Sequence, residues 1–185
     1  VEAKWGRSAP VELPGPGICH ARNRPMRYEH LVQINDPLMP LLDTLTRNQV
    51  WQGLMVRAED PAQFVLGLEG ATIHSHEVRG DVHELTRTLD FGSFRVEDRV
   101  RLVRDRGSEV RTEAGPTWPA SRLTITIEEP EPELLFLRFV YESDEAADGE
   151  ERDPVIVGLR EQAYERADLD TVVRIRALAE QGVLG

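Results

Sequence analysis

The sequence predicts an α+β fold in which a curved antiparallel sheet of seven strands wraps around a long C-terminal helix. Three observations support this prediction. Residues 26–35 alternate in polarity as a strand does, residues 71–142 hold six further strand-like runs, and residues 154–182 have a helical pattern. A sheet must cover its apolar face, and the C-terminal helix is the only predicted element long enough to do so.

The first part of the chain differs in composition from the rest. Residues 1–25 hold four prolines and three glycines without any periodicity, which is typical of a disordered segment. We therefore expect residues 1–25 to be a disordered N-terminal extension and residues 26–182 to form the domain.

One strand and two short helices are expected at the start of this domain. Residues 26–35 form the strand. Asp36 followed by Pro37 is typical of a helix cap and a first helical residue. Thr46 and Gln49 have the spacing of a capping box, which predicts a second short helix.

Six strands are expected to follow in succession. Their approximate ranges are 71–78, 82–90, 94–104, 108–114, 119–128 and 133–142. The first two would form a hairpin across the Gly-Asp turn at residues 80–81. This register places His83 opposite Val78 and Leu85 opposite His76.

Several polar residues are expected on the inner face of this sheet. His74, His76 and His83 would act as hydrogen-bonding groups in a cavity, lie partly in solvent, or share a metal ion. Their spacing matches no standard zinc pattern, so we expect no metal and no cofactor. Asp98 lies on the apolar face of its strand, and a buried carboxylate needs a partner or a raised pKa. It is therefore paired with Arg87 for structural reasons, placed near the margin of the sheet, or a general base or ligand anchor.

A long helix is expected at the C-terminus. Asp153 is its predicted cap, Pro154 its first residue and Gly182 its end. Arg174 would lie within its apolar stripe, where it either reaches the rim or binds an anionic group of a ligand. The other predicted members of that stripe are Ile156, Leu159, Ala163, Ala167, Thr171 and Leu178.

The composition argues against several classes of function. The net charge of −11 argues against nucleic acid and anionic membranes as partners, and no apolar run is long enough to cross a membrane. The single cysteine, Cys19, cannot form an intramolecular disulfide, so a cytoplasmic location is expected. The single lysine, Lys4, lies in the expected extension, which excludes a Schiff-base lysine in the domain.

Three stretches resemble a known family: WQGLMVRAEDP at residues 51–61, LTITIEEPEPELLFLRFVYE at residues 123–142 and YEHLVQIND at residues 28–36. They are similar to the acetylaranotin biosynthesis protein L-like family, and the likeness covers about residues 26–180. The order of elements resembles the START/Bet v 1-like (SRPBCC) superfamily, which has the helix-grip fold. The resemblance implies this fold and a pocket, and it implies no particular reaction.

A ligand site is expected on the cavity side of the sheet and helix. Its predicted members are His74, His76, Leu85, Arg87, Asp98, Phe139, Tyr141, Tyr164 and Arg174. Among them, Asp98 and His76 are the candidates for acid–base catalysis.

Three functions are compatible with these features. The preferred one is binding of a small apolar or aromatic molecule in an internal cavity between the sheet and the C-terminal helix. The first alternative is a cyclase- or dehydratase-like enzyme of natural-product metabolism that uses Asp and His groups in the cavity. This class is open because relatives that share the helix-grip fold include polyketide cyclases. The second alternative is an interaction module whose cavity is filled with side chains.

Overall fold

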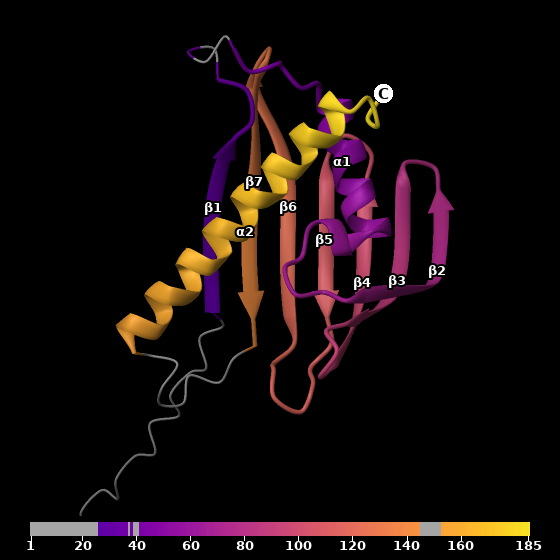
Figure 1. Cartoon of the computed structure of the whole chain (residues 1–185), viewed down its shortest axis with the longest axis vertical. Helices are drawn as coiled ribbons and strands as arrows, with labels where there is room; N and C mark the ends of the chain where they lie inside the picture. Colours follow the sequence, from indigo (N-terminus) through magenta and orange to yellow (C-terminus); the bar gives the residue numbers. More distant parts are fainter. Residues whose placement is uncertain (1–25, 37, 39–40, 145–152) are drawn as a thin grey trace, which may run out of the picture.

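The computed structural model describes residues 26–36, 38, 41–144 and 153–185, so the expected N-terminal extension lies outside the described residues. The strands are β1 (Met26–Gln33), β2 (Gly70–Arg79), β3 (Val82–Asp90), β4 (Arg95–Val103), β5 (Gly107–Thr112), β6 (Ser121–Glu131) and β7 (Leu134–Ser143). The helices are α1 (Arg47–Glu59), the 3-10 helix η1 (Pro61–Gln63) and α2 (Pro154–Glu180) (Figure 1). The predicted fold class is confirmed.

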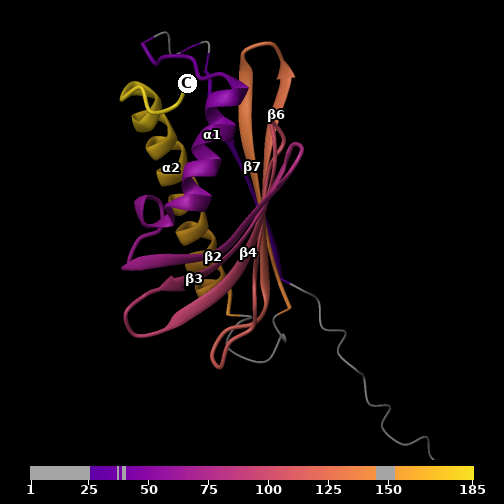
Figure 2. The ribbon, with the colours of Figure 1, turned by 90° about the vertical axis from the view of Figure 1, so that its right-hand side faces the viewer.

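All seven strands form one antiparallel sheet in the order β1-β7-β6-β5-β4-β3-β2. The first strand therefore pairs with the last, and β2 lies at the opposite edge. The sheet is strongly twisted, and α1 and α2 both lie on the same side of it, which we call the inner face (Figure 2). The outer face carries no helix within the described part of the chain.

The hydrophobic core lies between the inner face and the two helices. Inward-facing strand residues alternate with more exposed ones, as the two-residue period of a strand requires. The apolar strand residues exposed by 4% or less are Leu85, Val100, Leu102, Ile125, Ile127, Leu135, Leu137 and Phe139. From the helices, Val50 and Leu54 of α1 and Ile175 of α2 are equally buried. Each such side chain contributes about 1.5–3 kcal/mol by leaving water.

Gly53 allows α1 and α2 to approach each other closely. A methyl group at this position would lie only 2.7 Å from Cγ1 of Ile175, which is completely buried. Because protein interiors are close-packed, a larger side chain at residue 53 fits only if Ile175 or α2 moves.

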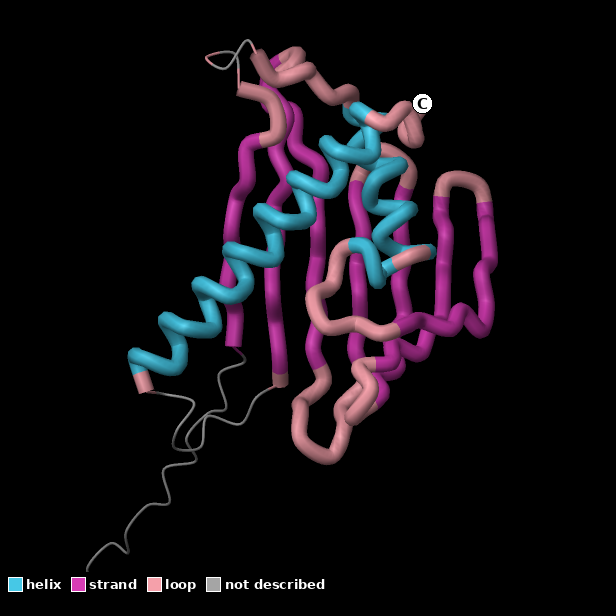
Figure 3. The backbone as a smooth tube through the Cα atoms, viewed as in Figure 1, coloured by secondary structure: helices cyan, strands magenta, loops and turns pink. Residues whose placement is uncertain are grey.

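The two short helices that follow β1 are α1 and η1. The capping box predicted for α1 is present, since Gln49 N donates to Thr46 Oγ1 (3.1 Å) and Thr46 N donates to Gln49 Oε1 (2.9 Å). The helix predicted to start at Asp36 is not present among the described residues from Asp36 to Thr46, which form turns and irregular structure. The other short helix is η1, which follows α1. Pro61 begins η1, and proline is favoured at a first helical position (Figure 3).

α2 begins at the predicted residue, but only the C-terminal part of its predicted apolar stripe, Thr171 and Leu178, is buried. Ile156 and Leu159 are 40% and 61% exposed, and Ala163 and Ala167 are exposed as well. The buried residues are Asp168, Thr171, Val172, Ile175 and Leu178. The reason is that α2 crosses the sheet obliquely, so that its first turns lie near the edge strand β1 (Figure 1). Neither α2 nor any other described helix is both long and apolar enough to span a bilayer.

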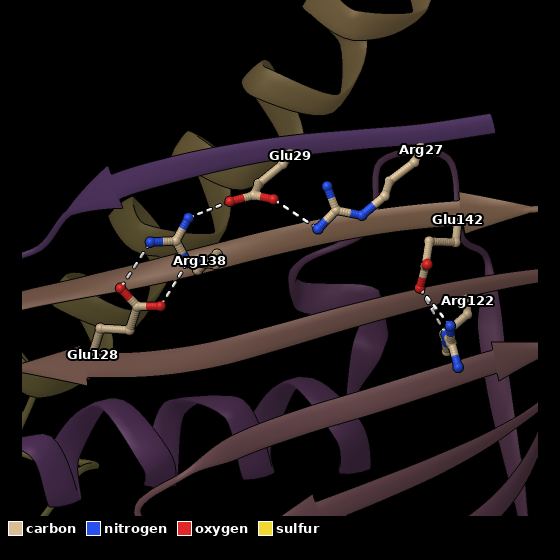
Figure 4. A network of polar contacts seen from close by, with 6 residues as sticks. All are labelled: Arg27, Glu29, Arg122, Glu128, Arg138 and Glu142. Atoms are coloured by element: carbon tan, nitrogen blue, oxygen red, sulfur yellow. Dashed lines mark hydrogen bonds and ion pairs between the residues drawn. The ribbon is translucent and has the colours of Figure 1, made fainter.

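The outer face carries ion pairs between neighbouring strands (Figure 4). Arg138 of β7 donates to Glu128 of β6 through Nε (2.5 Å) and Nη2 (3.0 Å), and it also binds Glu29 of β1. Arg122 donates to Glu142 through Nε (2.9 Å) and Nη2 (2.6 Å). All these side chains are about a third or more exposed, so they form a solvated ladder and not a site that excludes water.

Candidate functional site

A cavity of about 240 Å³ lies between the helices and one end of the inner face. The end of α1, η1, α2 and strands β3 to β7 all contribute to its wall. Its apolar wall includes Pro61, Val65, Leu89, Val110 and Leu123. Its polar groups include Arg57, Arg87, Asp98, Tyr141 and Tyr164.

The oblique course of α2 explains why the space is found at this end. The first turns of α2 extend beyond the edge strand β1, the helix then crosses β1 and β7, and its last turns lie beside α1 near the other end of the sheet (Figure 1). A straight helix therefore does not cover the ends of the central strands where α1 and η1 stop. A twisted sheet and a rigid helix leave a concave space there, which is a common location for ligands.

Arg87 and Asp98 form a buried ion pair in the wall of the cavity. Arg87 donates from Nε to Asp98 Oδ1 (2.9 Å) and from Nη2 to Oδ2 (2.5 Å), and both residues are exposed by 4% or less. Arg87 also donates from Nη1 to the carbonyl of Ala58 (2.6 Å) at the end of α1. Both residues are cross-strand neighbours on β3 and β4. The structure thus contains the Asp–Arg pair that the sequence left as one of several alternatives, and this pair attaches the sheet to α1.

Asp98 has no histidine beside it in the part of the chain that the structure describes. Both of its oxygens accept hydrogen bonds from Arg87, so this carboxylate is engaged in an ion pair. The acid–base arrangement of Asp98 with His76 is therefore not assembled.

Tyr141, Asp168 and His30 form a second polar group beside the cavity. Tyr141 donates its hydroxyl to Asp168 Oδ1 (2.6 Å), and His30 Nδ1 lies 3.0 Å from Oδ2. Burial is the main cause that raises the pKa of Asp168 above its usual 3.8, although the hydrogen bonds from Tyr141 and His30 oppose it. Burial, followed by the charge of Asp168, raises the pKa of Tyr141 as well, so this phenol stays protonated and acts as a donor.

The three tyrosines of the chain meet at the same place. The rings of Tyr141 and Tyr164 are stacked with centroids 4.0 Å apart, and Tyr28 lies 5.9 Å from Tyr164. The Tyr28 hydroxyl donates to Glu165 (2.9 Å), and burial with this bond raises the pKa of Tyr28 to about 12. Tyr141 and Tyr164 line the cavity and give it an aromatic wall.

Arg57 lies at the C-terminal end of α1 and also lines the cavity. Its Nε is buried without a hydrogen-bond partner, and no described carboxylate forms an ion pair with its guanidinium. Burial lowers the pKa of Arg57, while the nearby charges of Asp168 and Asp98 partly oppose this effect.

The histidines predicted for the cavity lie elsewhere. The predicted pairings of His83 with Val78 and of Leu85 with His76 are present, but a bulge between residues 73 and 75 shifts the register. His74 is consequently exposed, and its Nε2 lies 2.7 Å from the Thr88 hydroxyl. This corrects its predicted inward position.

His76 and His83 contact each other, with 3.2 Å between Nε2 and Nδ1, and His83 packs edge-on against Trp51. Burial, then the neighbouring His76, lowers the pKa of His83. Neither histidine lines the cavity, and no group of three potential ligands for a metal ion occurs within the described ranges.

The other predicted site residues divide between the core and the rim. Leu85 and Phe139 are each exposed by only 1% and belong to the core, not to the cavity wall. Arg174 donates to the side chain of Gln63 in η1, which is closer to the predicted rim position than to a ligand-binding one. Tyr141 and Tyr164 do line the cavity, as do Arg87 and Asp98.

Arg57, Asp168 and His30 were not identified from the sequence. Arg57 follows Val50 and Leu54 at helical spacing, and Asp168 precedes Thr171 and Ile175 in the same way. The sequence signal for the burial of Arg57 and Asp168 was therefore a charged residue that continues the apolar stripe of a helix.

A second hollow adjoins the cavity at the ends of the strands. Its volume is about 470 Å³, and it shares Arg122, Glu142, Thr112 and Ser121 with the cavity. Arg111 and Asp144 also line this hollow, so it is charged and suits water better than an apolar ligand. The smaller, more apolar cavity is therefore the better candidate for a ligand site.

Comparison with known proteins gives a family and a set of related folds. The family model described as Acetylaranotin biosynthesis cluster protein L matches residues 32–182. No curated protein matches the chain by sequence.

Among solved structures, one similar fold is the di-domain ARO/CYC StfQ from the steffimycin biosynthetic pathway. It is 9% identical with a TM-score of 0.58, and the match covers 88% of this chain and 53% of StfQ, so this chain spans about half of that protein. The Zhui aromatase/cyclase from a Streptomyces species is 16% identical, with a TM-score of 0.54 and coverage of 86% and 96%. Ara h 8.0201 is 5% identical, with a TM-score of 0.55 and coverage of 83% and 99%. These likenesses establish a Bet v 1-like fold.

Proposed function

The chain belongs to the family of the acetylaranotin biosynthesis cluster protein L, and from this premise we propose that it binds a small apolar or aromatic molecule in the cavity between sheet and helices. The observation that carries the proposal is the cavity of about 240 Å³ with an aromatic wall of Tyr141 and Tyr164. Apolar walls with a few convergent polar groups are characteristic of small-molecule sites.

The size of the cavity limits the ligand. Pockets for drug-sized molecules start at about 300 Å³. A volume of about 240 Å³ suits a molecule with one or two fused rings, or one part of a larger molecule. A void of this size also argues against an interaction module whose interior is filled with side chains.

The enzyme alternative has less support. StfQ and Zhui are described as aromatase/cyclases, but identities of 9% and 16% support a shared fold and not a shared reaction. The acid–base pair that such chemistry would use here, Asp98 with His76, is separated, because Asp98 is held by Arg87 and His76 lies outside the cavity. Binding therefore remains the preferred function.

The net charge and the cysteine content bear on the partners and the location that we propose for the protein. A net charge of −11 disfavours nucleic acid and anionic membranes as partners. A single cysteine is consistent with a reducing, cytoplasmic location.

The test is a calorimetric and NMR titration with the neutral probe 2-naphthylmethanol. We expect saturable binding and amide shifts confined to residues around the cavity. Val110→Trp should abolish binding, because the indole would fill the cavity from β5. Val78→Trp is the matched control, since Val78 is 57% exposed on β2 and the same substitution there should leave binding unchanged. Binding that survives Val110→Trp in a folded variant would contradict the proposal.

A further inference from the structure

We propose that the cavity is selective for molecules that carry a carboxylate, and that the guanidinium of Arg57 binds this group. The inference rests on the proposed function and adds the chemical class of the ligand. It starts from the placement of one cation in the wall of the cavity.

Arg57 is the cation in this wall that lacks an anionic partner among the described residues. Arg87 is paired with Asp98, and Arg122 is paired with Glu142. Arg57 has a buried Nε without any hydrogen-bond partner, although the residue lines the cavity. A buried charged group without partners is costly, so an anion that reaches it gains more than it would in water.

The two carboxylates whose charges act on Arg57, Asp98 and Asp168, are occupied by other groups. Both oxygens of Asp98 accept hydrogen bonds from Arg87, at 2.9 and 2.5 Å. The oxygens of Asp168 face Tyr141 and His30, at 2.6 and 3.0 Å. Their charges still act on Arg57 at longer range, but neither forms an ion pair with its guanidinium.

The geometry fits an aromatic acid better than a neutral molecule. A guanidinium presents parallel N–H donors that match the two oxygens of a carboxylate. The ring of the same ligand would pack against Tyr141 and Tyr164 and against apolar residues such as Val110 and Leu123. The net charge of −11 does not prevent this, because exposed charges are screened over about 8 Å at physiological salt.

The test compares two probes that differ only in the polar group, 2-naphthoate and 2-naphthylmethanol. At neutral pH we expect the wild-type protein to bind 2-naphthoate roughly 10- to 100-fold more tightly, as for a charge-assisted pair in a partly buried site. Arg57→Met keeps an unbranched apolar stem and removes the guanidinium with its charge. In this variant the preference for the acid should disappear, while the affinity for the alcohol stays within about twofold.

Two further variants keep the test decisive. Arg99→Met removes an arginine from β4 whose side chain is 73% exposed, and it should leave the preference for the acid unchanged. Arg57→Lys keeps a positive charge without the paired donors, so it should show a reduced preference for the acid. This variant tests the role of Arg57 in case Arg57→Met fails to fold.

The outcomes separate this inference from the proposed function. Equal wild-type affinity for the two probes would overturn the role of Arg57 and leave the binding function intact. A preference for the acid that persists in folded Arg57→Met would also overturn it. If neither probe binds the wild-type protein, both proposals fail.

Discussion

The two faces of the sheet use the same ionic chemistry in opposite environments. On the outer face, Arg138 and Glu128 join β7 to β6 with side chains that are 33% and 34% exposed (Figure 4). On the inner face, Arg87 and Asp98 join β3 to β4 with side chains that are 4% and 1% exposed. Each arginine donates two hydrogen bonds to its carboxylate. The geometry of the pairs is similar, so any difference in their energetic effect arises from solvent.

The two environments explain how polar groups are distributed in this fold. Exposed pairs are screened and contribute about 0–1 kcal/mol each. Buried pairs cost desolvation energy to form, but removal of one partner leaves an uncompensated charge. The outer face therefore tolerates change, whereas the inner face fixes the position of α1 relative to the sheet and thereby shapes the cavity.

The largest effect is expected from Asp98→Ala. The variant leaves the Arg87 guanidinium buried without its counterion, and we expect a loss of about 3–5 kcal/mol in the free energy of unfolding. Urea denaturation measures this loss. Glu128→Ala, which breaks the comparable pair on the outer face, is the matched control. A loss below about 1 kcal/mol for Asp98→Ala would remove the distinction between the two faces.

A smaller loss is expected from Tyr141→Phe. The variant removes the donor to the buried Asp168 and should cost about 1–3 kcal/mol, as for an unsatisfied buried acceptor. Tyr28→Phe belongs to the same ring cluster, but its hydroxyl binds Glu165 on the exposed side of α2. It should cost less than half as much in the same denaturation assay, and equal losses would contradict the argument.

The two faces should also respond to pH with opposite signs. Arg138 holds the pKa of Glu128 below its usual 4.5, so this pair stabilises the fold at neutral pH and loses that stabilisation as the pH falls through the folded-state pKa. Burial raises the pKa of Asp168 above its usual 3.8, so the folded state binds this proton more tightly. The contribution of Asp168 is therefore present below 3.8 and is lost as the pH rises through its folded-state pKa.

Asp168→Asn tests the inner-face part of this prediction. The variant should reduce the decline in unfolding free energy as the pH rises above 3.8, because asparagine does not titrate. Glu128→Gln should instead reduce the loss of stability at the acidic end of the same series. An unchanged pH profile in Asp168→Asn would show that the buried carboxyl does not titrate as described.

The smallest effect is expected from Glu128→Gln at neutral pH. It should change the free energy of unfolding by about 0–1 kcal/mol, because the pair with Arg138 is solvated. The change should vanish at about 1 M salt, where charges are screened over about 3 Å. A salt-independent loss would show that the outer ladder behaves like a buried pair.

Much of the fold could be predicted from the sequence because local patterns determine it. The two-residue alternation located the strands, and the Thr46–Gln49 capping box located the start of α1. The sequence placed Arg87 and Asp98 on the same face of neighbouring strands but left their pairing open, and the structure shows them as cross-strand neighbours. The bulge at His74 was not predictable, because one extra residue in an edge strand leaves the alternation on either side intact.

The site was less predictable than the fold because it depends on how α2 crosses the sheet. In the stripe given by a helical wheel, Thr171 and Leu178 are buried, whereas Ile156 and Leu159 are exposed. Charged residues such as Arg57 and Asp168 are usually assigned to the surface, since their burial requires partners that are distant in sequence. The partners of Asp168 show this separation, because His30 precedes it by 138 residues and Tyr141 by 27 residues.

The close contact of Gly53 with Ile175 has a consequence for the history of the family. Because a methyl group at residue 53 would lie 2.7 Å from Ile175, the sizes of these two side chains are coupled. Relatives with alanine or serine at position 53 should carry valine or alanine at position 175, and paired substitutions of this kind should recur in independent lineages. Where both positions are large, the two helices must separate, and the space available to a guest molecule would grow accordingly.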